Sequence, residues 1–181
     1  MTKQPFGAMT CTAMALRPLY GQKTTWIGSL MRKFLVLLDD SHECLNAMRF
    51  AAMRAANGGG GVVIMSVIPT ADIQHGFGVA DVMRAEAHER IEAHFEVFAK
   101  WMRSRPRVEP ELIIREGDPA EEVIAQIAED PEIGVVVLGL NSDKSSQNPV
   151  LNRLLRDAAA LACPITIVPG DIPKERLEAI T

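Results

Sequence analysis

Two adjacent carboxylates, Asp39 and Asp40, directly follow an uninterrupted apolar run at residues 34–38. Five apolar residues without polar alternation predict a strand that is covered on both faces, as in parallel sheets sandwiched by helices. In open α/β sheets, ligands bind beyond the carboxyl ends of the strands, at the switch point of the topology. The sequence therefore places a candidate binding site at the end of this strand, with Asp39 as its first residue.

The same pair of carboxylates also has a structural interpretation. Asp40 precedes Glu43 by three residues, and in such a pair each side chain can accept a hydrogen bond from a free amide at a helix start. Asp40 is therefore predicted to cap the helix that follows. Asp39 is either a ligand contact or a carboxylate that the strand end tolerates, and the residues alone leave both interpretations open.

The cysteine and histidine spacings argue against a metal centre or a nucleophilic active site. Cys11, Cys44 and Cys163 are scattered and odd in number, and they lack a Cys-x-x-Cys spacing. His88 and His94 lie six residues apart, about 240° around a helix, so they cannot share an ion. Because no Ser-His-Asp or Cys-His arrangement is visible either, we expect no metal site and no enzymatic activity.

Length, composition and charge narrow the class of protein. A chain of 181 residues with 48% hydrophobic content can bury one good core, so one domain is expected. No apolar run approaches the roughly 20 residues that cross a bilayer. The net charge is −4, and the first 32 residues hold four basic and no acidic residues, so residues 33–181 carry −8. With its unpaired cysteines, the chain is predicted to be cytoplasmic, without a membrane or nucleic-acid surface.

The chain divides into three parts. Residues 1–32 show neither helical nor strand periodicity, and we expect a disordered or non-native extension, with Met31 as an alternative first residue. A targeting segment is the other interpretation, although this stretch lacks an apolar h-region. Residues 33–170 are predicted to form the folded domain, and residues 171–181 a tail with a short helix.

Five short apolar runs alternate with helical patterns along the domain. The helix after the first run ends at a glycine cluster, residues 57–61, and the longest helix spans residues 79–103. Short connections and right-handed crossovers then give an α/β fold, a doubly wound parallel sheet with helices on both faces. The strands are predicted at residues 34–38, 62–68, 111–115, 133–138 and 164–168.

Two later helices have clear amino-terminal signals. Asp118 is predicted to cap a helix that has Pro119 at its first position, and Asn148 to cap another that begins with Pro149. Gly139 is placed directly after the fourth strand. The helix that begins at residue 149 is predicted to turn five side chains inward: Val150, Leu154, Leu155, Ala158 and Leu161.

With these elements placed, residues 33 to about 170 resemble the universal stress protein family. Each matching piece is weakly specific, but their order and spacing together are strong. The resemblance implies a Rossmann-like sheet of the adenine nucleotide alpha hydrolase type, with strand order 3-2-1-4-5, and a homodimer. The matching pieces are residues 35–41, 63–67, 117–121, 135–139 and 163–168.

The resemblance also implies a ligand site. In nucleotide-binding members an adenine nucleotide, ATP or AMP, lies in a cleft that corresponds here to the space between Asp39 and Gly139. The position of Asp39 meets the base or ribose, and that of Val67 lines the adenine. The binding members carry Gly-x2-Gly-x9-Gly-Ser/Thr, but here the second glycine falls on Ser142 and the final pair on residues 152–153. Side chains there obstruct the close approach of backbone to phosphate.

A polar loop stands where the glycines are missing. Asn141 and Ser142 offer an amide and a hydroxyl, Ser145 and Ser146 add hydroxyls, and Lys144 adds a positive charge. The following helix also points its positive end toward the cleft. These residues could hold an anion or a nucleotide. A solvated connection with no ligand is the alternative interpretation.

These features lead to two predicted functions. The first is a stress-response regulatory or chaperone-like dimer with an altered or lost nucleotide site, and the alternative is an ATP- or AMP-binding member with a non-glycine loop. A response-regulator receiver would need an Asp ending the third strand and a Lys ending the fifth, where this chain has Arg115-Glu116 and Val168-Pro169. The homodimer is expected to form through residues 164–168, because an uncovered apolar edge strand favours pairing with its copy.

Overall fold

The computed structural model describes residues 32–39, 41–70, 79–141 and 148–181. The extension predicted for residues 1–32 therefore lies outside the described residues, except for Arg32. Ser142 and the three loop residues predicted with it, Lys144, Ser145 and Ser146, also lie outside them.

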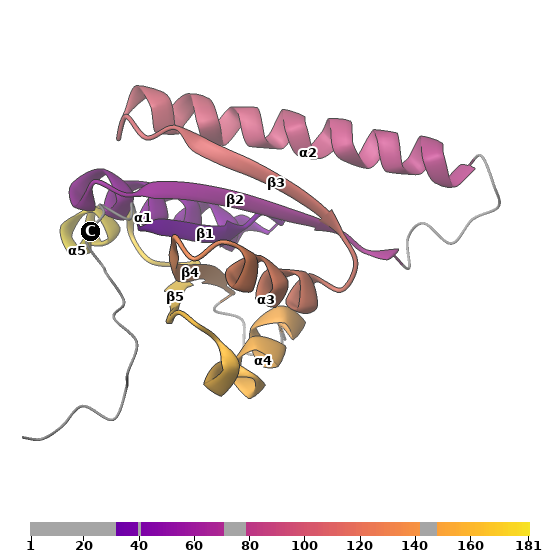
Figure 1. Cartoon of the computed structure of the whole chain (residues 1–181). Coiled ribbons are helices and arrows are strands. Elements are labelled where there is room, and N and C mark those ends of the chain that lie inside the picture. The colour runs from indigo at the N-terminus through magenta and orange to yellow at the C-terminus, as the bar shows by residue number, and fades with distance from the viewer. Residues whose placement is uncertain (1–31, 40, 71–78, 142–147) are drawn as a thin grey trace, which may run out of the picture.

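Five parallel strands form one sheet in the order β3-β2-β1-β4-β5 (Figure 1). This confirms the predicted fold and strand order. The central strand β1 pairs on both sides, with Val36 opposite Ile64 of β2 and Val137 of β4. The strands are β1 (Lys33–Leu37), β2 (Gly61–Ile68), β3 (Pro110–Glu116), β4 (Ile133–Leu140) and β5 (Ile165–Pro169).

Helices cover both faces of the sheet (Figure 1). One face packs against α1, α2 and α5, and the other against α3 and α4. The alternation along β1 shows this directly, because Leu35 is buried on the side of α3 and α4 whereas Val36 is buried on the side of α1 and α2. The helices are α1 (His42–Gly58), α2 (Val79–Ser104), α3 (Pro119–Glu129), α4 (Pro149–Arg156) and α5 (Lys174–Ile180).

The amino-terminal caps follow the sequence signals in two helices of three. The Asp118 side chain accepts hydrogen bonds from the first turn of α3, and Asn148 does so for α4, as predicted. The predicted Asp40 cap of α1 is wrong. Ser41 is the cap, with an extended backbone and a hydroxyl that accepts from the Cys44 amide at 3.3 Å. Asp39 in turn accepts from the Ser41 amide at 3.0 Å, and this local turn delays the helix start by one residue.

Two predictions near the end of the domain are also wrong. Gly139 lies inside β4, which continues to Leu140 because β5 pairs with it along that length. Leu155 and Ala158 are exposed and not inward-facing, with Leu155 at 51% exposure. The reason is that α4 has only eight residues and buries a single narrow stripe, Leu151 and Leu154.

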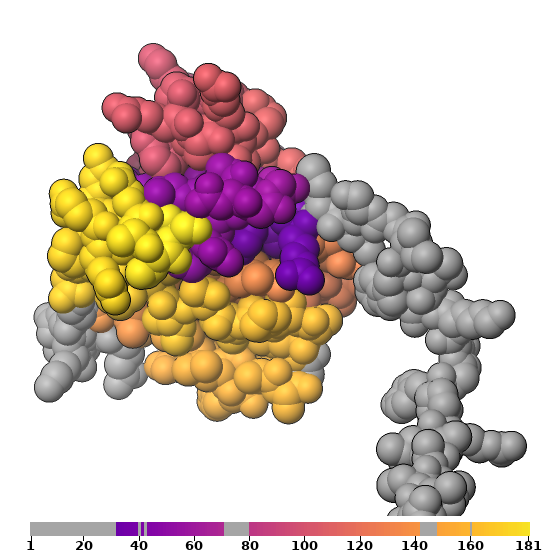
Figure 2. Space-filling view, turned by 90° about the vertical axis from the view of Figure 1, so that its left-hand side faces the viewer, coloured from indigo at the N-terminus to yellow at the C-terminus, as the bar shows by residue number. Residues whose placement is uncertain are grey.

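The carboxyl-terminal residues pack onto the domain. The Leu177 side chain of α5 is fully buried. The Asn46 side chain of α1 donates to the Gly170 carbonyl at 2.8 Å, and Arg54 donates to the Thr181 carbonyl at 3.1 Å. Figure 2 shows α5, in yellow, beside α1, in purple. The tail is thus a third helix on the α1 face of the sheet.

Candidate functional site

A pocket of about 340 Å³ lies at the carboxyl ends of β1 and β4. These two strands are neighbours at the point where the chain, having built outward from β1 through β2 to β3, crosses to the other side of the sheet. Ligands of doubly wound sheets bind at this switch point, and the volume falls within the range of small-molecule sites. The pocket is lined by Leu37, Leu38, Asp39, Ser41, Glu43, Val67, Pro119, Gly139, Leu140, Asn141, Asn148, Pro149 and Val150.

The structure brings most of the predicted site residues to this one pocket. Asp39 lies two residues after β1, Val67 comes from β2, Gly139 lies near the end of β4, and Asn141 directly follows β4. Ser142 lies outside the described residues. The four described residues come together because parallel strands end at the same edge of a sheet.

The Glu43 side chain is the pocket residue that the sequence reasoning missed. It lies in the first turn of α1 and is only partly exposed. Its spacing from Asp40 predicts only a capping partner for that residue. The signal that could have found it is positional, because a helix that follows a strand without delay begins at the edge where that strand ends.

Gly139 is required by the packing of α1 against β4. A Cβ atom at residue 139 would lie 2.6 Å from the Glu43 carbonyl oxygen and 2.7 Å from its carbonyl carbon. Both atoms belong to the backbone, so they cannot move aside as a flexible side chain would. At Gly170, directly after β5, an added Cβ would likewise collide with the Glu43 side chain. The first turn of α1 is therefore held between the ends of β4 and β5.

The charged side chains that line the pocket are both acidic. Asp39 accepts hydrogen bonds from the amide and the hydroxyl of Ser41, which fix its position at the rim. The Glu43 carboxylate has no hydrogen bond or ion pair with any residue that the structure describes. The described lining residues include no Lys, Arg or His. The field inside the pocket is therefore set by two carboxylates without a counter-ion among those residues.

Three helices, α1, α3 and α4, begin at the pocket, and the first-turn amides of α3 and α4 are largely occupied. In α3, Pro119 has no N–H, and the amides of Ala120 and Glu121 both donate to the Asp118 carboxylate at 3.0 Å. The amide of Glu122 donates to the Asp118 carbonyl. These bonds leave no amide in that turn for a bound anion.

The start of α4 is occupied in nearly the same way. Pro149 has no N–H, the Leu151 amide donates to the Asn148 side chain at 2.9 Å, and the Asn152 amide donates to the Asn148 carbonyl. The Val150 amide alone is left in this turn. A phosphate group would therefore find one helix-terminal donor where an uncapped helix would present several.

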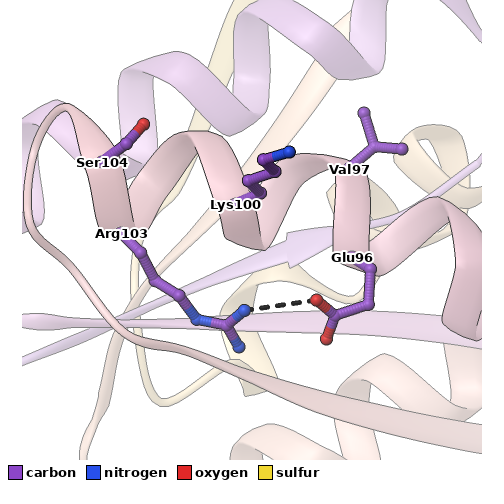
Figure 3. Close-up of a pocket in the computed structure, with 5 residues that line it drawn as sticks. All are labelled: Glu96, Val97, Lys100, Arg103 and Ser104. Carbon is purple, nitrogen blue, oxygen red and sulfur yellow. Dashed lines mark hydrogen bonds and ion pairs between the residues drawn. The ribbon is translucent and has the colours of Figure 1, made fainter.

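A second hollow lies on the surface of α2, away from this edge of the sheet (Figure 3). It is larger, about 630 Å³, but it is an open groove along one helix. Arg103 pairs with Glu96 at 3.2 Å and with Glu109 at 2.8 Å, and Val97 is 66% exposed. Its polar groups are paired with one another or point outward, so the pocket at β1 and β4 is the better ligand site.

The described residues assemble neither a metal centre nor an activated nucleophile. Within them no group of three or more His, Cys, Asp and Glu side chains could hold an ion. Burial raises the pKa of the Cys163 thiol, which disfavours the reactive thiolate. In the described part of the chain, no helix is long and apolar enough to cross a membrane.

Comparison with protein families shows similarity over most of the chain. A family model described as the universal stress protein family matches residues 31–169. The curated proteins gave no significant match.

Solved structures share the fold at low sequence identity. The universal stress protein UspA from Lactobacillus plantarum is 18% identical, with 75% of this chain and 96% of that chain covered and a TM-score of 0.60. A family protein from Burkholderia pseudomallei is 24% identical, with coverage of 78% and 98% and a TM-score of 0.55. A family protein from Arabidopsis thaliana, solved with AMP bound, is 13% identical, with coverage of 80% and 97% and a TM-score of 0.51.

Proposed function

The chain belongs to the universal stress protein family, and we propose that it is a cytoplasmic stress-response regulatory or chaperone-like protein with an altered nucleotide site. In this proposal the protein acts by binding and catalyses no reaction. Its pocket keeps the side that would receive a base and ribose, while the sequence lacks the glycines with which family members hold a triphosphate.

The occupied amino termini of α3 and α4 carry this proposal. Tight phosphate binding needs several free backbone amides or glycines that let the backbone approach closely. Here the caps Asp118 and Asn148 and the prolines after them take up most of those amides. Residues 152–153, where the family motif has its final Gly-Ser/Thr, lie within α4, and Arg153 pairs with Asp157 at 2.7 Å.

A nucleotide-binding function is the second candidate. It is supported by the convergence of Asp39, Val67, Gly139 and Asn141 on one pocket of suitable volume. The Arabidopsis thaliana protein with the same fold was solved with AMP bound. In this alternative a non-glycine phosphate loop would allow the protein to bind ATP or AMP.

Calorimetry with ATP, ADP and AMP, each with and without Mg²⁺, separates the two functions. Because the helix-terminal donors are largely occupied, we expect ATP to bind no more than a few-fold tighter than AMP. ATP binding more than about tenfold tighter than AMP, about 1.4 kcal/mol, would reject the altered site and favour the second candidate. Phosphate release assayed on the same samples would reject the non-enzymatic role.

We further propose a homodimer through β5. Among the described strands, β5 is at the edge of the sheet and pairs with β4 alone, and its Ile167 side chain is 39% exposed. An edge strand with an apolar surface can pair with its copy in a two-fold arrangement. A charge at Ile167 would have to be desolvated in that contact.

Light scattering coupled to size exclusion tests the dimer. Ile167→Asp is expected to halve the molecular mass, whereas Val97→Asp, at an exposed valine on α2, should leave it unchanged. An Ile167→Asp protein that remains a dimer would show that the copies meet elsewhere.

A further inference from the structure

The Glu43 carboxylate occupies an unusual position at the pocket. It is partly buried in the first turn of α1, and its main chain and side chain are confined by Gly139 and Gly170. It makes no hydrogen bond or ion pair with the residues that the structure describes. A carboxylate at the pocket with no hydrogen-bond partner among the described residues is free to accept hydrogen bonds from a ligand.

Asp39 adds a second carboxylate to the same pocket. Its position is fixed by Ser41, so it cannot turn away from an approaching group at no cost. On α4, whose first turn lines the pocket, Arg153 pairs with Asp157 and Glu121. Among the described lining residues nothing offsets the two negative charges, so an anionic group placed there would be repelled by both.

The rest of the lining suits an uncharged molecule with an apolar part. Leu37, Val67 and Leu140 supply apolar surface at the strand ends, and Asn141 supplies an amide. Carboxylates accept hydrogen bonds, and hydroxyl and amino groups donate them. A ligand with an apolar ring and several hydroxyl or amino donors would therefore satisfy Asp39 and Glu43 together.

We propose that the pocket selects an unphosphorylated nucleoside over the corresponding nucleotide, with Glu43 and Asp39 as the residues that discriminate. This rests on the proposed function, because it assumes that the pocket at β1 and β4 is the ligand site. It adds the ligand class and the cause of selectivity: the donors of the sugar and base are bound by carboxylates, which also repel a phosphate.

Titration calorimetry of the full chain with adenosine and AMP, in buffer without divalent cations, tests the selectivity. Adenosine is expected to bind at least about tenfold tighter than AMP, as like charges at close range require. AMP binding as tightly as adenosine, or no binding of either, would overturn the proposal. Neither outcome bears on the proposed function with its altered nucleotide site, because that proposal is rejected only if ATP binds far tighter than AMP.

Two matched variants assign the discrimination to its residue. Glu43→Gln keeps the shape and removes the charge, so the adenosine preference should fall by about three- to tenfold, chiefly because AMP binds better. Glu89→Gln removes the same charge from an exposed position on α2 and should leave the preference unchanged. Thermal melting of both variants verifies folding. An unchanged preference in a folded Glu43→Gln protein would overturn the assignment.

Discussion

At the amino edge of the sheet, Lys33 extends its ammonium group among three carboxylates, whereas at the carboxyl edge Asp39 and Glu43 line a pocket with no cation among its described residues. The Lys33 nitrogen lies 3.2 Å from Glu111, 3.1 Å from Asp130 and 3.1 Å from Glu132. It thereby joins β1, β3 and the turn that leads into β4.

The pKa of Lys33 reflects this environment. Burial alone would lower it, but the hydrogen bonds to Glu132, Asp130 and Glu111 outweigh that effect and hold the pKa well above its ordinary value. The carboxyl edge is joined differently, by the close packing of α1 on Gly139 and by the bond from Asn46 to Gly170. The amino edge is thus held together by ion pairs. The carboxyl edge is held together by close packing, and its two carboxylates remain available to a ligand.

Gly139→Ala should give the largest effect, because it attacks the close packing at the carboxyl edge. The added Cβ would meet the Glu43 backbone at 2.6 Å, so α1 must shift, at a cost of about 2–3 kcal/mol in the free energy of unfolding. Urea denaturation measures it. Gly58→Ala, where nothing lies within 4 Å of the new Cβ, is the control and should be neutral or slightly stabilising. Equal stability of the two variants would show that α1 is loosely seated.

Lys33→Met tests cohesion at the amino edge. Removing the ammonium group leaves three neighbouring carboxylates without their cation. Because the side chains of Glu111 and Glu132 are exposed to solvent, we expect the free energy of unfolding to fall by only about 1–2 kcal/mol. Lys100→Met, at an exposed position of α2, provides the control. If both variants unfold at the same urea concentration, the amino edge is held by strand pairing alone.

The stability difference between the native protein and Lys33→Met should depend on pH, with a sign set by the direction of the Lys33 pKa shift. A pKa raised on folding stabilises the protein fully below the unfolded value, about 10.5, and less as pH rises toward the folded value. Native protein should therefore exceed Lys33→Met in stability equally at pH 7 and 9, and by a smaller margin at pH 11. A margin that widens at pH 11 would contradict the raised pKa.

Glu43→Gln should have the smallest effect on stability. The carboxylate has no described partner, so removing its charge should change the free energy of unfolding by less than about 0.5 kcal/mol. The same urea titration measures it. A loss above 1 kcal/mol would mean that Glu43 holds the fold together as Lys33 does, and the contrast between the edges would disappear.

Much of the fold could be predicted from local patterns. Apolar runs such as residues 34–38 predict buried strands because no polar side chain interrupts them, and Asp118 and Asn148 identify helix starts through their own hydrogen bonds. Ser41 replaced the predicted Asp40 cap because two adjacent polar residues offer the same chemistry. The inward prediction for Leu155 is wrong because apolar periodicity shows which helix face can be buried. It does not show how many residues of that face the sheet covers.

By itself, the sequence determined the order of strands and helices, the family, and the acidic end of β1, because these depend on residues close together in the chain. The tertiary structure alone decided that Glu43 shares a pocket with Val67 and Asn141, and that Lys33 meets Glu111 and Asp130. Such groupings depend on how strands far apart in sequence align at a common edge. Only folding brings those ends together.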